Sequence, residues 1–162
     1  MIMGWAEWLE ETPLAYFIQG DLYAFPLLEV LHVVSIALVV GTIFIVDLRL
    51  LNWCSKSYQV TRLLRAMLPL TLGAFGFAAV TGFLMFSSQP TRYLETPVFL
   101  LKMGLLLLAA VNMAIFHVWT QRGIAQWDTE GAVPLSARTA GLISMVLWVA
   151  ILVAGRFVGF LL

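Results

Sequence analysis

The stretch Leu31–Arg49, LHVVSIALVVGTIFIVDLR, decides the fold of this 162-residue chain. It is long and apolar enough for a helix that crosses a bilayer, whose hydrocarbon core is roughly 30 Å thick. It nevertheless carries His32 near one end and Asp47 near the other, and Glu29 comes just before it. An ionisable group within hydrocarbon costs roughly 2.5–3.5 kcal/mol on insertion scales, so such groups usually mark a functional site. Since the chain has only two histidines, His32 is the first candidate for chemistry.

The composition is that of an integral membrane protein. Hydrophobic residues make up 62% of the chain and charged residues 11%, and the mean hydropathy is +0.96. The net charge is zero and basic residues form no runs, which argues against nucleic acid as a partner. The single cysteine, Cys54, excludes an internal disulfide and a cysteine-rich metal or iron–sulfur site.

Four stretches have the length of a membrane span. Backbone groups in lipid must be hydrogen-bonded internally, so these stretches are expected to be helices, and their short connections make neighbours antiparallel. The sequence predicts an all-α integral membrane four-helix bundle that forms a single domain over residues 1–162, with lipid as its main environment. The expected spans are residues 26–51, 64–87, 97–119 and 137–162.

Residues 1–24 precede the first span. Trp5, Trp8 and Leu9 recur at helical spacing within Met1–Leu14, and the glutamates of this segment take the other side. We expect a short amphipathic helix that lies in the membrane interface, with its tryptophans at headgroup depth.

The distribution of Lys and Arg predicts the orientation. Six of the nine basic residues flank or occupy the first and third connections, and three belong to the opposite side. The positive-inside rule then places these connections in the cytoplasm and both termini outside, in a bacterial inner (plasma) membrane. The six are Arg49, Lys56, Arg62, Arg65, Arg122 and Arg138; the three are Arg92, Lys102 and Arg156.

Polar residues within the spans fall into two layers. His32 lies 6 residues past Pro26, and Lys102 lies 5 past Pro97 on the parallel third helix. Arg156, near the end of the antiparallel fourth helix, should reach a similar depth. Glu29 shares a helix face with His32, three residues away. The predicted outer layer contains Glu29, His32, Lys102 and Arg156.

The inner layer pairs Asp47 with His117. They lie 21 and 20 residues past the prolines that open their helices, so we expect them to be in contact. Arg49 is close by and offers Asp47 an alternative ion pair. The two histidines differ by 14 residues of depth, about 20 Å, which excludes their binding one metal ion in a single subunit.

Each of these residues also has a purely structural interpretation. Lys102 and Arg156 could extend to the headgroups, and His117 could interact with the carboxyl-terminal dipole of its helix. The Met85 side chain either fills space in the core or serves as an axial ligand of a metal. The glycines and alanines of the second span, from Gly73 to Gly82, allow either close helix packing or room for a flat cofactor.

The first span resembles the opening helix of HemJ-type protoporphyrinogen oxidases and CopD-like membrane domains. The shared positions are a Leu-His pair ending at His32, a glycine at Gly41 and an arginine at Arg49. The third span is similar in its early Lys102 and late His117. The resemblance implies that His32 ligates a b-type haem.

The chain departs from HemJ in Asp47 before Arg49, in its added N-terminal segment and in lacking the carboxyl-terminal Asn-Glu-Pro signature. It is more similar to an uncharacterised bacterial family of small four-helix membrane proteins.

These observations lead to three hypotheses. The first is a b-type haem protein that transfers electrons or oxidises a membrane-soluble substrate, with a quinone or another apolar redox partner. The second is a CopD-like copper-handling protein with a shallow site at Glu29 and His32. The third is a non-catalytic subunit of a homo-oligomer or larger membrane complex.

Overall fold

The computed structural model describes residues 2–54, 58–120, 123–124, 127–128 and 133–162. Within these ranges the regular structure is entirely helical. Four helices are long and apolar enough to span a membrane, which confirms the predicted fold class. Their bounds agree with the predicted spans to within a few residues. They are α3 (Ala24–Leu50), α4 (Val60–Ser88), α6 (Pro97–Ile115) and α7 (Leu135–Leu161), with α6 continued by the π-helical turn η1 (Phe116–Thr120).

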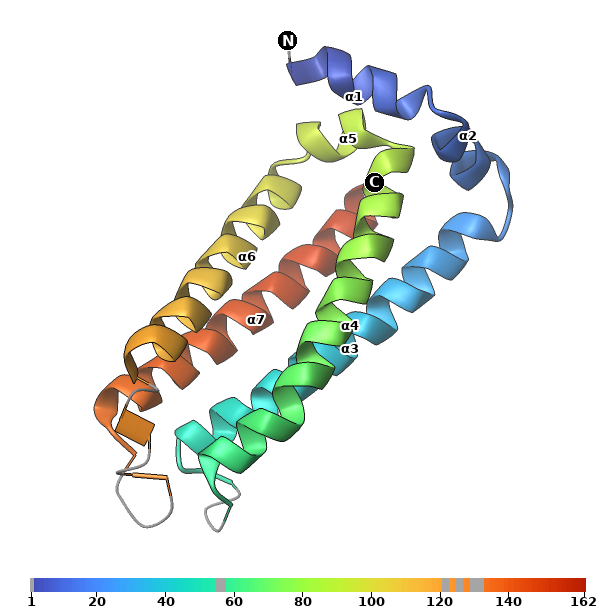
Figure 1. The fold of residues 1–162 in the computed structure, drawn as a ribbon. Helices are drawn as coiled ribbons and strands as arrows, with labels where there is room; N and C mark the ends of the chain where they lie inside the picture. The colour runs from blue at the N-terminus through green and yellow to red at the C-terminus, as the bar shows by residue number, and fades with distance from the viewer. Residues whose placement is uncertain (1, 55–57, 121–122, 125–126, 129–132) are drawn as a thin grey trace.

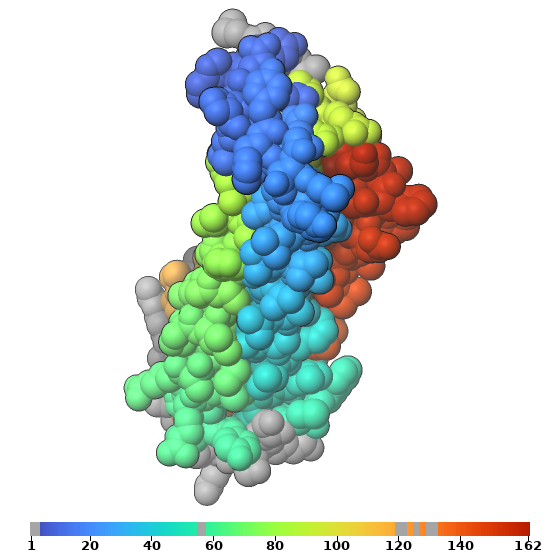
Figure 2. All heavy atoms as spheres, turned by 90° about the vertical axis from the view of Figure 1, so that its right-hand side faces the viewer, coloured from blue at the N-terminus to red at the C-terminus, as the bar shows by residue number. Residues whose placement is uncertain are grey.

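The bundle consists of two helix pairs. Helix α3 packs along α4, and α6 packs along α7 (Figure 1). The view from the side shows α3 and α4 next to each other over their length (Figure 2). Contacts between α3 and α7 join the pairs, whereas α4 and α6 have few contacts with each other. Both termini lie at one end of the bundle, and the first and third connections lie at the other (Figure 1).

Three short helices cover the end that carries the termini: α1 (Ile2–Glu10), α2 (Pro13–Gly20) and α5 (Pro90–Glu95). The predicted single helix in Met1–Leu14 is therefore wrong in its bounds. Thr12 and Pro13 separate two helices, because the Thr12 hydroxyl accepts a hydrogen bond from the Ala15 amide (3.3 Å) and proline favours the first helical position.

The N-terminal helices are tied to the bundle. The Thr91 hydroxyl of α5 donates to the Glu10 carboxylate (2.6 Å), and the Gln19 side-chain amide donates to the Ser88 carbonyl. Trp5 and Trp8 remain 45% and 68% exposed, which suits tryptophans in a membrane interface.

At the opposite end, side chains define the helix boundaries. Asn52 ends α3 in a left-handed conformation (φ 61°), with hydrogen bonds from Trp53 to Leu48 and from Asn52 to Arg49 that satisfy the last carbonyls. The Asp128 carboxylate accepts hydrogen bonds from the Thr61 amide (3.0 Å) and hydroxyl at the start of α4. Two bases used for the predicted orientation, Lys56 and Arg122, lie outside the described residues.

Candidate functional site

His32 is held between α3 and α4. Its Nδ1 lies 3.0 Å from the Thr81 hydroxyl, which also lies 2.9 Å from the Phe77 carbonyl of its own helix. The imidazole rests against Gly82, where a Cβ atom would lie 2.9 Å from Cε1. Such a contact is closer than van der Waals packing allows, so the absence of a side chain at Gly82 lets the imidazole occupy this position.

The sequence did not identify the partner of His32. Glu29 shares a helix face with His32, but the hydrogen bond of the imidazole is to Thr81 on α4. Counting residues gives the depth of a side chain in the membrane but not the direction in which it points across the bundle. The run of small residues ending at Gly82 was the available signal, since it marks where α3 and α4 approach closely.

Lys102 and Glu29 lie against glycines of α7. A Cβ atom at Gly155 would be 3.7 Å from the Lys102 ammonium nitrogen, and one at Gly159 would be 3.9 Å from Glu29 Oε1. The structure thus places Lys102 and Glu29 in the same half of the bundle, as predicted.

The other two predicted outer residues have different surroundings. Arg156 is exposed, which fits the alternative in which its guanidinium extends to the headgroups. Met85 and Glu29 line a small cavity of about 140 Å³, together with Phe25, Gln89, Tyr93, Gly159 and Leu162. His32 does not line this cavity.

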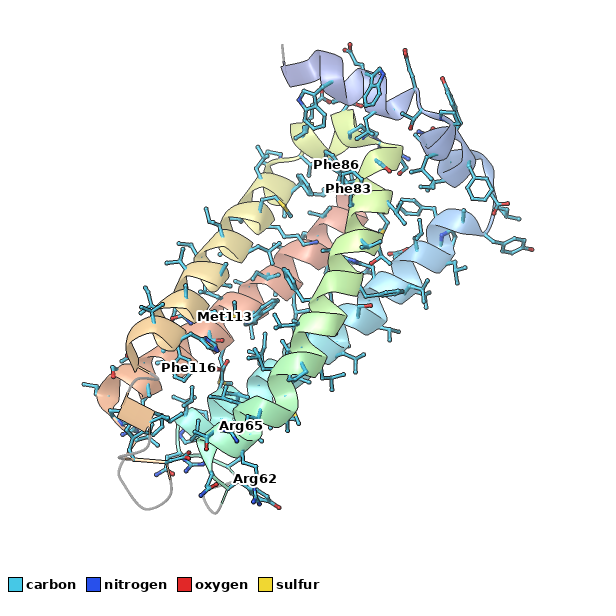
Figure 3. The ribbon with its side chains drawn as sticks, in the orientation of Figure 1. Arg62, Arg65, Phe83, Phe86, Met113 and Phe116 are labelled. Atoms are coloured by element: carbon cyan, nitrogen blue, oxygen red, sulfur yellow. The ribbon has the colours of Figure 1, made fainter. Side chains whose placement is uncertain are left out.

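Aromatic side chains cover the outer end of the bundle. Phe86 stacks on Phe99 (5.6 Å between centroids) and contacts Tyr93 (5.8 Å) and Trp5 (6.2 Å). The Tyr93 phenol lies on α5, where burial, followed by the nearby Glu29 carboxylate, raises its pKa. Tyr93 is therefore uncharged at neutral pH, as a buried side chain next to a carboxylate should be. Figure 3 labels Phe86 and Phe83 at this end of α4.

The inner layer surrounds a larger cavity of about 220 Å³. All four long helices contribute to its walls, and most of the lining is apolar, including Phe75, Phe116 and Trp148. Met113 and Phe116 of the α6–η1 wall are labelled in Figure 3. The polar residues on its surface are Asp47, Thr71, Asn112, His117 and Ser144.

Asp47 is buried without a full set of partners. It is 5% exposed, and its Oδ2 atom has no hydrogen-bond partner. The alternative ion pair with Arg49 is not formed, because the Arg49 Nε–H donates to the Tyr58 carbonyl (2.8 Å). Helix α7 fixes the backbone here, since a Cβ atom at Gly141 would lie 3.3 Å from the Asp47 carbonyl oxygen.

Asp47 and His117 line the same cavity, so their predicted common depth agrees with the structure. The expected contact between Asp47 and His117 is not seen as a hydrogen bond. Instead, His117 Nδ1 bonds to the Met113 carbonyl (2.9 Å), and no hydrogen bond joins His117 to Asp47 Oδ2. His117 lies on the π-helical turn, whose geometry differs from that of the regular helix assumed in counting depth.

Within the described part of the chain, no three His, Cys, Asp or Glu side chains are grouped so that they could hold a metal ion.

Comparisons with known proteins place the chain in a family. No curated protein and no solved structure matches it. A family model matches residues 5–161, almost the whole length, and the chain therefore belongs to DUF6644, a family of unknown function.

Proposed function

We propose that this protein is a membrane-embedded b-type haem protein that transfers electrons or oxidises a membrane-soluble substrate, with His32 as the axial ligand. The observation that carries the proposal is the hydrogen bond between His32 and Thr81 within the membrane-spanning part of the bundle. A haem needs a neutral imidazole with one free nitrogen, and this hydrogen bond favours that state.

The tautomer follows from the contacts of Thr81. The Thr81 hydroxyl has one hydrogen, and the carbonyls of Phe77 (2.9 Å) and Ala78 (3.2 Å) are acceptors for it on its own helix. When that hydrogen goes to a carbonyl, the Thr81 oxygen accepts a hydrogen bond from His32, which requires the proton on Nδ1. In that tautomer Nε2 carries the lone pair that would bind an iron atom, as in other histidine sites where a second contact fixes the ring.

The surrounding charges also fit the group. A haem carries two propionates, for which Lys102 and Arg156 would be the cationic partners. Glu29 and Met85 are at the same end, but they line a cavity that His32 does not line, so this cavity does not support Met85 as the second axial ligand. The bound haem would supply one-electron redox chemistry, while the protein would hold it and keep water away from it. The resemblance to HemJ-type oxidases expected from His32, Gly41 and Arg49 of the first span points to the same ligand.

The other two hypotheses lack a comparable observation. Copper would prefer several imidazole, thiolate or thioether ligands, and His32 does not share the cavity of Met85 and Glu29. An accessory role in a homo-oligomer or larger complex would leave the position of His32 without a purpose beyond packing.

The visible spectrum of purified protein, produced with an ample haem supply, tests the proposal. We expect a Soret band and a pyridine haemochrome of b type. Colourless protein that contains copper by metal analysis would favour the second hypothesis, and colourless protein without metal would favour the third.

We also propose the inner membrane orientation with both termini outside, on the basis of the positive-inside rule. Cys54 is exposed in the first connection and provides a test. An impermeant thiol reagent added to intact cells should leave it unlabelled, whereas labelling would reverse the orientation.

A further inference from the structure

The inner cavity opens sideways, toward the lipid. Leu72 and Phe75 of α4 and Met113 of α6 line it, yet they remain 52%, 45% and 47% exposed. They lie on the two long helices that have few contacts with each other. On a membrane-spanning bundle, an opening between these helices leads to the acyl chains, so the cavity is accessible to a lipid-soluble molecule.

The size and walls of the cavity suit one ring. A dry cavity of about 150 Å³ is large enough for benzene. The inner cavity has about 220 Å³, and Phe75, Phe116 and Trp148 line it. Aromatic side chains favour stacked or edge-on contacts with a bound ring. A longer apolar tail would leave through the opening between α4 and α6.

The two ionisable residues of the cavity wall offer hydrogen-bond acceptors. Asp47 Oδ2 has no partner, although the side chain is 5% exposed. His117 Nδ1 bonds to the Met113 carbonyl, which can only accept, so a neutral imidazole has its proton on Nδ1 and a lone pair on Nε2. One of the two N–H groups of Asn112 is already engaged with the Ala140 carbonyl (3.1 Å).

A ligand that donates hydrogen bonds matches the acceptors of Asp47 and His117. A purely apolar molecule would leave Asp47 Oδ2 without a partner, which is unfavourable for a buried polar atom. A molecule with carbonyl groups alone would face Asp47 and His117 with further lone pairs. A ring with hydroxyl groups satisfies both, while its apolar body fits the walls.

We propose that this cavity is a binding site for a membrane-soluble hydroquinone, with Asp47 as the main acceptor for a ring hydroxyl and His117 as a second. The site recognises the reduced, hydroxyl-bearing form in preference to the quinone. This site would supply the substrate class for the redox function proposed above. The site does not depend on a haem at His32, because Asp47 and His32 are 15 residues apart on α3, about 22 Å.

The test compares ligands that differ only in their donors. Decylubiquinol, decylubiquinone and the dimethyl ether of decylubiquinol are titrated by calorimetry into the protein in lipid nanodiscs, with empty nanodiscs subtracted. We expect the quinol to bind about tenfold more tightly than the ether or the quinone, which corresponds to about 1.4 kcal/mol and is within the range of one net hydrogen bond.

Two variants localise the site. Asp47→Asn keeps the shape but adds a donor, so the preference for the quinol should fall below about threefold or reverse. Ala110→Phe, on a residue that lines the cavity, should fill it and abolish binding of all three ligands. Ala114→Phe, at an exposed position of α6 that does not line the cavity, is the matched control and should bind as the wild type does.

Equal binding of the quinol and its ether, or an unchanged preference in Asp47→Asn, would overturn the proposal. Tighter binding of dodecylamine than of the quinol, lost in Asp47→Asn, would also overturn it and assign the cavity to lipophilic amines. None of these outcomes depends on a haem spectrum, so failure here and failure at His32 can be told apart.

Discussion

The ionisable side chains in the two halves of the bundle have different surroundings. His32 has a specific partner in Thr81, and Gly82 leaves the room that the imidazole needs. Asp47 is more deeply buried and lines an apolar cavity, yet one of its carboxyl oxygens has no hydrogen-bond partner. A side chain that one ring nitrogen holds in place can serve as a fixed ligand through the other, whereas a carboxyl with an unpaired oxygen beside a cavity can receive a ligand. The difference supports a cofactor at the first position and an exchangeable ligand at the second.

The largest expected effect concerns the space around His32. Gly82→Leu places a side chain where even a Cβ atom would be 2.9 Å from the imidazole, so the ring must move and its bond to Thr81 must break. We expect a loss of about 3 kcal/mol in the free energy of unfolding, at the upper end for overpacking. Unfolding in mixed micelles of increasing SDS fraction, followed by circular dichroism, measures it.

Gly76→Leu is the control for that variant, because a Cβ atom at Gly76 meets nothing within 4 Å. It should unfold like the wild type. Equal destabilisation by the two substitutions would mean that the contact between Gly82 and His32 has no special role.

For the Asp47 carboxyl we predict a substitution that raises the free energy of unfolding, whereas Gly82→Leu lowers it. Asp47→Leu removes a buried polar group and fills part of the cavity, so we expect the free energy of unfolding to rise by about 2 kcal/mol in the same assay. Binding sites commonly carry such a stability cost.

The matched substitution Asp128→Leu should lower stability by about 1 kcal/mol, because the Asp128 carboxylate holds the start of α4 through the Thr61 amide and hydroxyl. If both aspartate variants lose stability, Asp47 has a structural partner, and the contrast between the two halves of the bundle disappears.

The smallest expected effect comes from the single hydrogen bond at His32. Thr81→Val keeps the shape of the side chain and removes the hydroxyl, which should cost about 0.6 kcal/mol, the average for hydrogen bonds between membrane helices. Thr81→Ser should restore the wild-type value. If the variant binds haem, its midpoint potential should also shift, because the imidazole loses the contact that fixes its tautomer. A Val variant identical to the wild type in both measurements would argue against this contact.

The fold was largely predictable because its signals are local. Apolar runs of about 20 residues gave the four long helices, and depth counting placed Asp47 and His117 at one level. The break between α1 and α2 was also encoded locally, in the pair Thr12 and Pro13. The expected helix ran across this pair because the amphipathic pattern alone was used to set its bounds. Pro90 similarly opens the short helix α5, which was not predicted.

The contacts of the site were harder to predict because they depend on helix rotation. A hydropathy pattern that is apolar all round does not say which side of α3 meets α4, so Thr81 and Gly82 were not matched with His32. The π-helical turn that carries His117 has no distinct sequence signature.

The most direct test of the central claim compares the visible spectra of two histidine variants with that of the wild type. His32→Ala should lose the Soret band while the protein still inserts in the membrane, because the axial ligand is gone. His117→Ala should keep it, since His117 belongs to the other cavity. A wild type that stays colourless despite ample haem, or a His32→Ala variant with the full spectrum, would contradict the account.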